Sequence, residues 1–187
     1  MRITGGSFKN RRLAPLGGLK IRPTSDKVRE AIFSIIGQDM GSCNALDLFA
    51  GTGCLGLEAL SRNATKVLFI DSSPQAIQLI KKNLERCGCQ NRAMVVRRDL
   101  SRPASMENLP MIGPFNLVFM DPPYRKGYIP SILRTLSVKM SLSPLAKVVA
   151  ESSNLDRLPD RAENLKKRFS RLYGETRITI YSFEEQS

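Results

Sequence analysis

Short apolar and β-branched runs alternate along the chain with segments in which apolar residues recur at helical spacing. Runs typical of strands occur at residues 45–49, 66–70, 92–97, 115–120 and 147–151. Helices are expected between them at residues 53–61, 73–87 and 128–139, with a weaker helical stretch between the third and fourth strands. This alternation predicts right-handed βαβ units that build a mostly parallel sheet with helices on both faces.

The two ends of the chain add a helix and a hairpin to this pattern. Residues 24–26 (Thr-Ser-Asp) are N-cap candidates for a helix that ends at Gly37. Near the other end, residues 169–173 and 177–183 are typical of strands, and the short connection between them predicts a hairpin. The sequence therefore predicts an α/β fold with a seven-stranded, mostly parallel sheet and a C-terminal antiparallel hairpin, in which residues from about 23 to 187 form one unit.

Composition favours a single domain with a polyanionic partner. The 187 residues are 42% hydrophobic, which suffices for a substantial core but leaves no room for a second full domain. Lys and Arg number 29 against 17 Asp and Glu, and the net charge of +12 favours nucleic acid, with a generically basic protein as the alternative. Residues 1–25 contain no acid and carry the basic residues Arg2, Lys9, Arg11, Arg12, Lys20 and Arg22.

The sequence predicts no membrane anchor, disulfide framework or metal site. No apolar stretch approaches the length that spans a bilayer, and the N-terminus lacks the apolar core of a secretion signal, so we expect a cytoplasmic protein. The four cysteines lie in unlike contexts and are expected to be reduced. Cys87 and Cys89 could suggest a metal, but the chain has no histidine and no second pair with ligand spacing.

A glycine-rich loop, Gly51 to Gly56, follows the first strand and fits the pattern G-x-G-x-x-G. Dinucleotide-binding folds use such a loop to hold a pyrophosphate, but Asp47 would repel that group and attract a ligand with an ammonium and a sulfonium, as in S-adenosyl-L-methionine. Asp71 and Asp99 follow the next two strands and could accept from the ribose hydroxyls and the adenine amine. An ordinary strand-end or capping role is the alternative for each acid.

A turn of sequence Asp121-Pro122-Pro123-Tyr124 follows directly on the strand at residues 115–120. The prolines donate no backbone N–H, so the turn offers mainly acceptors and suits a planar NH2 group. Tyr124 adds a flat face on which an unstacked base could lie. A rigid turn with no ligand is the alternative.

These residues resemble those of the class I S-adenosylmethionine-dependent methyltransferases and, more closely, of the ribosomal small subunit methyltransferase D family. The resemblance covers nearly the whole chain and rests on residues 2–13 (RITGGSFKNRRL), the segment from Arg22 to Phe33, the glycine loop and the Asp-Pro-Pro-Tyr turn. It implies a Rossmann-like methyltransferase domain at residues 23–187, preceded by a basic N-terminal extension at residues 1–22 that forms an RNA-binding hairpin. The activity it implies is methylation of guanine N2 in 16S rRNA, at position 966 in the customary numbering.

The resemblance and the strand-end acids together define a predicted site. The catalytic residues are expected to be Asp121, Pro122, Pro123 and Tyr124. The cofactor is expected to contact Thr24, Asp26, Phe33, Asp47, Phe49, Ala50, Gly51, Thr52, Gly53, Gly56, Asp71, Ser72, Asp99 and Leu100. The RNA is expected to contact Arg2, Lys9, Arg11, Arg12, Arg22, Arg125 and Lys126. Because the chain has no histidine, an imidazole base is excluded, and the proton leaves to Asp121 or water after methyl transfer.

Three other activities are compatible with parts of the pattern. Adenine-N6 methylation of DNA uses the same tetrapeptide, but such enzymes usually resemble this core with an added target-recognition domain, for which the chain has no room. Protein-glutamine methyltransferases resemble Asn-Pro-Pro-Tyr at this position and need no basic arm. A non-catalytic RNA-binding assembly factor is the third. The favoured partner is 16S rRNA or a partly assembled small ribosomal subunit, bound by a monomer.

Overall fold

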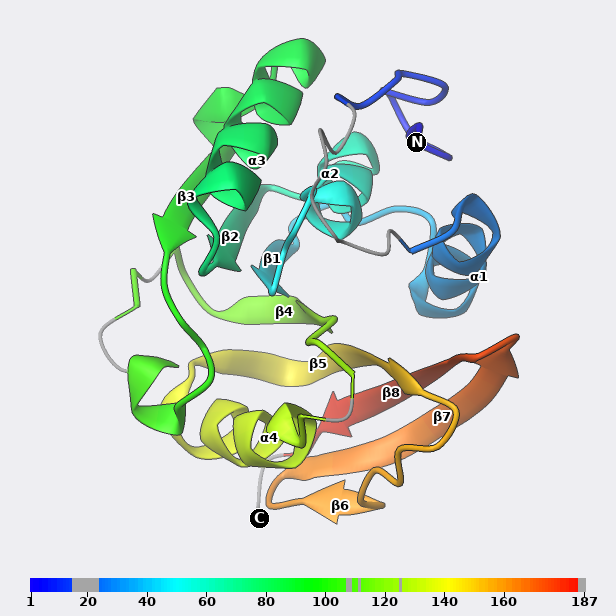
Figure 1. Ribbon diagram of the computed structural model, residues 1–187, viewed down its shortest axis with the longest axis vertical. Coiled ribbons are helices and arrows are strands. Elements are labelled where there is room, and N and C mark those ends of the chain that lie inside the picture. Colours follow the sequence, from blue (N-terminus) through cyan, green and yellow to red (C-terminus); the bar gives the residue numbers. More distant parts are fainter. Residues whose placement is uncertain (15–23, 107–108, 111, 125, 185–187) are drawn as a thin grey trace.

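Within residues 1–14, 24–106, 109–110, 112–124 and 126–184, which the computed structural model describes, eight strands form one sheet in the order β3-β2-β1-β4-β5-β8-β7-β6 (Figure 1). Strands β1 to β5 are parallel, and β8, β7 and β6 continue the sheet in antiparallel fashion. The strands are β1 Asn44–Leu48, β2 Lys66–Asp71, β3 Ala93–Arg97, β4 Phe115–Met120, β5 Leu142–Ser153, β6 Arg161–Ala162, β7 Leu165–Tyr173 and β8 Thr176–Phe183.

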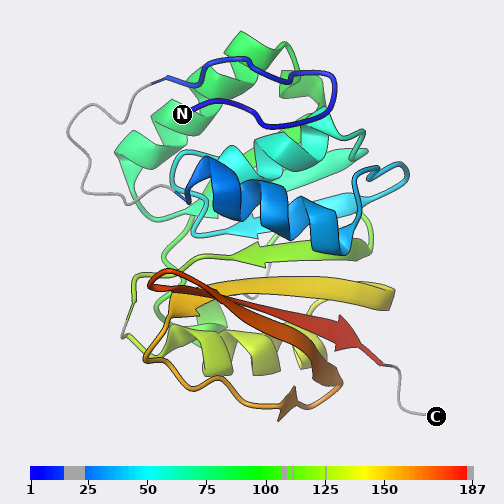
Figure 2. The same ribbon diagram turned by 90° about the vertical axis from the view of Figure 1, so that its right-hand side faces the viewer.

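Helices cover both faces of the sheet (Figures 1 and 2). The helices are α1 Asp26–Ile36, α2 Cys54–Ser61, α3 Pro74–Cys87 and α4 Tyr128–Lys139. The first three pack on one face, where their apolar residues meet side chains such as Phe69 and Phe119. Helix α4 packs on the other face, where Leu46, Val118 and Val148 point. Because successive strand residues point to opposite faces, nearly continuous apolar runs are needed to fill both cores.

Local signals explain where the helices begin and end. Ser25 accepts from the backbone N–H of Val28 at the start of α1, and Ser73 accepts from that of Ala76 at the start of α3. Gly88 ends α3 in the left-handed conformation, which glycine adopts without strain. The predicted boundaries of these helices therefore follow from capping chemistry.

The predicted α/β class, mostly parallel sheet and C-terminal hairpin are confirmed, with two differences. The two-residue strand β6 adds an eighth strand to the seven expected. The weak helix expected between the third and fourth strands is wrong, because the described residues of that segment contain only a short 3-10 turn at Pro103–Met106. Pro110, Gly113 and Pro114 are poor helix formers and explain this outcome.

Residues 1–14 fold back on themselves and pack against the helices. The backbone N–H of Ile3 donates to Arg11 at 3.0 Å, and Arg2 and Arg12 form an antiparallel bridge. Ile3 and Leu13 are buried in the same core as α1, α2 and α3. This basic segment thus lies on the helical layer of the β1 to β3 half of the molecule (Figure 2).

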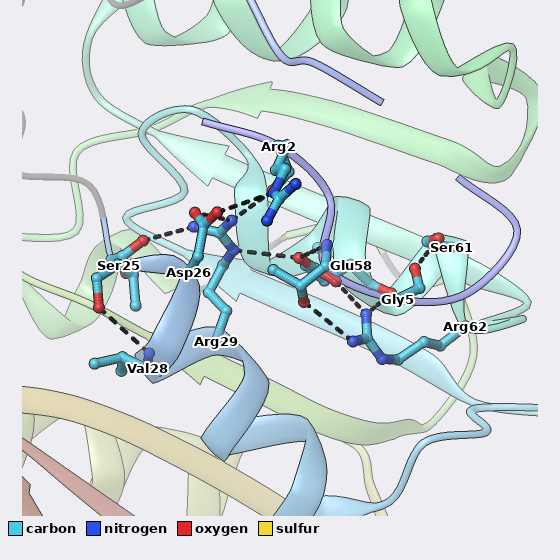
Figure 3. Close-up of polar contacts among 12 residues, drawn as sticks. Arg2, Gly5, Ser25, Asp26, Val28, Arg29, Glu58, Ser61 and Arg62 are labelled. Atoms are coloured by element: carbon cyan, nitrogen blue, oxygen red, sulfur yellow. Dashed lines mark hydrogen bonds and ion pairs between the residues drawn. The ribbon is translucent and has the colours of Figure 1, made fainter. Parts of the chain in front are cut away.

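A buried charge cluster joins this segment to α1 and α2 (Figure 3). Arg29 and Glu58 are each 0% exposed, and Arg29 Nε donates to Glu58 Oε1 at 3.2 Å. Glu58 also forms an ion pair with Arg62 and accepts from the backbone N–H of Thr4 at 2.7 Å. Arg29 Nη2 donates to the carbonyl of Arg2 at 2.5 Å. Buried charges need such partners, so the cluster fixes the three segments relative to one another.

Arg29 also holds the start of α1. Its Nη1 donates to the carbonyl of Thr24 at 2.6 Å, and its Nη2 contacts Asp26 Oδ1 at 2.9 Å. The hydrogen bond from Arg29 to the Thr24 carbonyl sets the position of Thr24, which lies at the carboxyl edge of the sheet.

Two further features concern the cysteines and the lengths of the helices. Each of the four cysteines is buried and unpaired. Among the residues that the structure describes, no helix has both the length and the apolar character to cross a membrane.

Candidate active site

Four carboxylates gather at the carboxyl ends of neighbouring parallel strands. Asp47 lies on β1, Asp71 ends β2, Asp121 follows β4 and Glu151 lies near the end of β5. Parallel α/β sheets bind ligands at this edge. The sequence predicted the first three acids, and the structure adds Glu151.

The glycine loop between β1 and α2 has a preformed shape. Gly51 and Gly53 have positive φ angles of 55° and 74°, which favour glycine. Phe49 also has a positive φ of 59°, an uncommon conformation for a bulky residue and one that clusters at functional sites. Its ring stacks on Tyr128 with centroids 6.0 Å apart. The carbonyl of Thr52 accepts from the buried Asn83 amide at 3.0 Å, which ties the loop to α3.

Gly56 allows α2 to lie directly on β2. A Cβ atom at this position would lie 2.3 Å from Cε1 of Phe69 and 2.9 Å from a methyl group of Val67. The close approach requires glycine, and it fixes the helix N-terminus next to the strand ends. Ala50 completes the loop by donating its N–H to the carbonyl of Ile70 at 3.0 Å.

Asp47 is a buried acid with a raised pKa. It is 2% exposed, and Oδ2 accepts from the backbone N–H of Gly56 at 2.9 Å. Burial raises the pKa of Asp47 from 3.8 to about 8, the Gly56 hydrogen bond opposes the rise, and the negative charge of Asp71 adds to it. A cation beside Asp47 would favour its ionised form, whereas a pyrophosphate would not.

Asp71 connects the loop to the second strand. Its Oδ2 accepts from the N–H of Gly51 and its Oδ1 from that of Ser73, both at 2.8 Å. Each carboxylate oxygen has a second lone pair that a ribose hydroxyl could use. Ser72 is exposed beside it. The ribose-binding role of these residues stays a prediction.

Asp99 lies after β3 on a more open part of the same edge. It is exposed, and its Oδ1 accepts from the backbone N–H of Ser101 at 2.9 Å, which lowers its pKa. The neighbouring Leu100 is buried in the core. The contact of Asp99 with adenine and the contact of Leu100 with the cofactor stay predictions.

The Asp-Pro-Pro-Tyr turn is held by Glu151. Tyr124 donates its hydroxyl to Glu151 Oε1 at 3.0 Å and lies 3.2 Å from Thr176 Oγ1. Thr24 donates to Glu151 Oε2 at 3.1 Å and lies 3.5 Å from Asp121 Oδ2. Burial, with the charges of Glu151 and Asp121, raises the pKa of the Tyr124 hydroxyl, so it remains a donor to Glu151.

A cavity of about 90 Å³ opens at this turn. Pro122, Pro123 and Tyr124 form one wall, the start of α4 forms another, and residues 156–158 form a third. Lys126 lines the same cavity and is exposed. The turn therefore borders a hollow that adjoins the acids.

Sequence reasoning missed Glu151, although a signal was present. The apolar run at residues 147–151 ends in this acid. The acids that were predicted have similar positions, because Asp47 lies near the end of the first run and Asp71 directly follows the second. Only the structure shows that Glu151 contacts both Thr24 and Tyr124.

Other predicted residues lie outside the cluster of acids. Phe33 is fully buried, with its ring centroid 5.8 Å from that of Phe119. Asp26 forms ion pairs with Arg29 and Arg2 at 2.9 and 3.5 Å. Their assignment to the cofactor stays a prediction.

The predicted RNA contacts remain predictions as well. Lys9, Arg11 and Arg12 are all exposed on the N-terminal segment, and Arg11 also donates to the carbonyl of Arg86 at 2.8 Å. Two of the predicted positions, Arg22 and Arg125, lie outside the described residues.

Comparison with known proteins identifies the family. The family model described as conserved hypothetical protein 95 matches residues 1–182. YlbH of Bacillus subtilis (strain 168) is 36% identical over 97% of this chain and 98% of its own length. Ribosomal RNA small subunit methyltransferase D of Escherichia coli (strain K12) is 32% identical over 100% of this chain and 91% of its own. The chain belongs to the ribosomal RNA small subunit methyltransferase D family.

The fold supports the same assignment. The solved structure of the yhhF protein of Escherichia coli matches with a TM-score of 0.84 at 32% identity, over 100% of this chain and 99% of that chain. The methyltransferase D family predicted from the sequence is thus confirmed, and so is the class I methyltransferase fold.

Proposed function

We propose that this protein is an S-adenosylmethionine-dependent methyltransferase that methylates the exocyclic N2 of a guanine in 16S rRNA of the small ribosomal subunit. One observation carries the proposal: the acceptor-rich turn at Asp121 and the glycine loop beside Asp47 lie at the same edge of one sheet. The Escherichia coli relative is named for methylation of small-subunit rRNA, which supports rRNA as the substrate class.

The residues at the glycine loop fit this cofactor. Asp47 is buried and its pKa is raised to about 8. A ligand that brings positive charge would stabilise its ionised form. Asp71, which already accepts from Gly51, offers further lone pairs for ribose hydroxyls. Bound S-adenosylmethionine would supply an electrophilic methyl group and leave as a neutral thioether. Asp47 and Asp71, with the glycine loop, would hold it.

The turn residues would orient the guanine amine. The Asp121 carboxylate and the Pro122 carbonyl would accept its two hydrogens and direct the nitrogen lone pair toward the methyl group. Tyr124 would stack on the base, and its hydroxyl bonds to Glu151 and Thr176 hold the ring in place. After transfer, the proton would leave to Asp121 or to water, because the chain has no histidine.

The proposal extends to partner and setting. Residues 1–22 would serve as a basic extension that engages RNA, ahead of the methyltransferase domain at residues 23–187. Of these, Arg2, Lys9 and Arg12 are exposed. Contacts to phosphates position RNA without reading its sequence. The protein would act as a monomer in the cytoplasm, on 16S rRNA or a partly assembled subunit.

Transfer of labelled methyl groups tests this function. We expect label to enter 16S rRNA taken from a strain that lacks the protein, and Asp121→Ala to reduce transfer by about 10²- to 10³-fold while cofactor binding persists. Asp39→Ala, which removes an exposed acid distant from the turn in sequence, is the matched control. Label in duplex DNA, or loss of cofactor binding in Asp121→Ala, would contradict the assignment.

A further inference from the structure

A second hollow adjoins the candidate active site. It has a volume of about 500 Å³ and lies between residues 154–158, which follow β5, and strands β7 and β8. In Figure 1 this connection runs past β7 and β8 toward β6. Asp156, Arg157 and Leu158 line both this groove and the cavity at Pro122. The two hollows therefore share a wall.

The groove is positively charged. Among the described residues that line it, Arg157, Lys167 and Arg177 are cations, and Asp156 is the acid. Asp156 already accepts from the backbone N–H of Ser153 at 3.0 Å. A net positive lining of this kind attracts anions.

The two arginines have hydrogen-bonding capacity left for a ligand. Arg157 is exposed and makes no hydrogen bond or ion pair with the described residues. Arg177 donates from Nη1 to Ser170 Oγ and from Nη2 to the carbonyl of Asn154, each at 3.4 Å, and each of these nitrogens carries a second N–H group. A guanidinium has five N–H donors, and two long hydrogen bonds occupy few of them.

Lys167 has a different role. Its ammonium donates to the carbonyl of Leu158 at 2.9 Å and to Asp160 at 2.6 Å. It therefore holds the wall of the groove in place. Ser170 and Thr179 are paired across β7 and β8, with their hydroxyl oxygens 3.3 Å apart, and add polar groups to the floor.

We infer that this groove binds the sugar–phosphate backbone of the RNA next to the target guanine, with Arg157 and Arg177 on its phosphates. The inference rests on the proposed function, because a base at Tyr124 requires its flanking backbone to pass close by. The groove shares residues 156–158 with the cavity at that tyrosine. Arginine suits phosphate because its planar donors match the oxygens.

The groove also lies apart from the N-terminal basic segment. That segment packs on α2 and α3, as shown by the bonds of Ser7 to Ser61 and of Arg11 to Arg86. The groove lies on the antiparallel half of the sheet. RNA held at both places would be fixed on either side of the reacting base.

Binding of a 16S rRNA fragment at several salt concentrations tests the inference. We expect Arg157→Ala and Arg177→Ala each to weaken binding about five- to ten-fold and to reduce the slope of log affinity against log salt by about 0.7. Cofactor affinity, and the transfer rate at saturating RNA, should change less than about two-fold. Arg134→Ala, which removes an exposed arginine on α4 outside the groove, is the matched control.

Unchanged affinity and salt slope in both variants, relative to Arg134→Ala, would overturn the inference. Equal weakening of a duplex DNA probe and of the RNA would overturn the assignment to RNA. If Arg177→Ala lowers thermal stability, Arg157→Glu decides alone, because Arg157 is exposed. Failure of the proposed function is a separate result: the unmodified protein would then transfer no methyl group to rRNA.

Discussion

Replacement of Asp47 by asparagine would test how the site selects a cation. The change Asp47→Asn removes the charge but keeps the size of the side chain, and the amide oxygen can still accept from the Gly56 N–H, which Asp47 binds at 2.9 Å. Because Asp47 is 2% exposed, ionisation without a ligand places a charge in a poorly solvated position. The variant should therefore stabilise the ligand-free protein and weaken cofactor binding.

The size of the effect depends on pH. The pKa of Asp47 is about 8 in the folded protein, whereas a solvated aspartate, as in the unfolded chain, has a pKa of 3.8. The folded state therefore binds the proton more tightly than the unfolded state. Stability contributed by this proton is complete below pH 3.8 and is lost as pH rises toward about 8. One pKa unit corresponds to about 1.4 kcal/mol, so raising the pH by about two units within this window should widen the advantage of the variant by about 3 kcal/mol. For a domain of this size that is about 6 to 12 °C in Tm.

Thermal unfolding of the ligand-free proteins across this pH range measures the difference in Tm between Asp47→Asn and the unmodified protein. Asp39→Asn, at an exposed acid, is the control. Calorimetry of S-adenosylmethionine binding supplies the second readout. Affinity of the unmodified protein should rise with pH up to about 8, with release of a proton, whereas Asp47→Asn should bind about ten-fold or more weakly without that pH dependence. A Tm gap that does not widen with pH, or equal cofactor affinity, would refute the reasoning.

Three further predictions concern positioning and packing. Glu151→Gln should lower kcat about ten- to one-hundred-fold with little change in cofactor affinity. In the double variant, Tyr124→Phe should cause no further loss of kcat, because the two side chains share one hydrogen bond. Additive losses of kcat in transfer assays would contradict this. Gly56→Ala should lower the unfolding free energy by about 1 to 3 kcal/mol in urea titrations, because its methyl group would meet a buried ring at 2.3 Å, whereas Gly41→Ala should change it little. Arg29→Met should lower the unfolding free energy by about 3 to 5 kcal/mol in the same titration, since it removes one of the two arginines paired with the buried Glu58 and the donors to the carbonyls of Thr24 and Arg2; an unchanged midpoint would show that the cluster contributes no stability.

Most of the parallel half of the fold could be predicted because its signals are local. Helices α1 and α3 carry serine N-caps, and strands β1, β2 and β4 are apolar runs buried on both faces. In the antiparallel half, the bounds of the strands depend on how the strands pair with one another. Strand β7 begins at Leu165, earlier than the predicted residue 169, because Lys166 and Lys167 pair with β8 across a register shift. Polar residues of this kind give no strand pattern in the sequence.

The site shows the same division. Asp47, Asp71 and Asp121 could be predicted because each lies at or near the end of a recognisable strand. Glu151 also ends a recognisable apolar run, but its role could not be assigned from the sequence, because its partners, Tyr124 and Thr24, lie 27 and 127 residues away. The basic groove likewise forms only when the chain after β5 folds against β7 and β8.

Nucleoside analysis of methylated 16S rRNA tests the central claim most directly. Ribosomal RNA from a strain that lacks the protein would be incubated with the purified protein and S-adenosylmethionine, digested, and analysed by mass spectrometry. We expect N2-methylguanosine among the released nucleosides, and we expect it to be lost when Asp121→Ala replaces the unmodified protein. Methylation of adenine N6, or no methylated nucleoside from an active, cofactor-binding preparation, would contradict it.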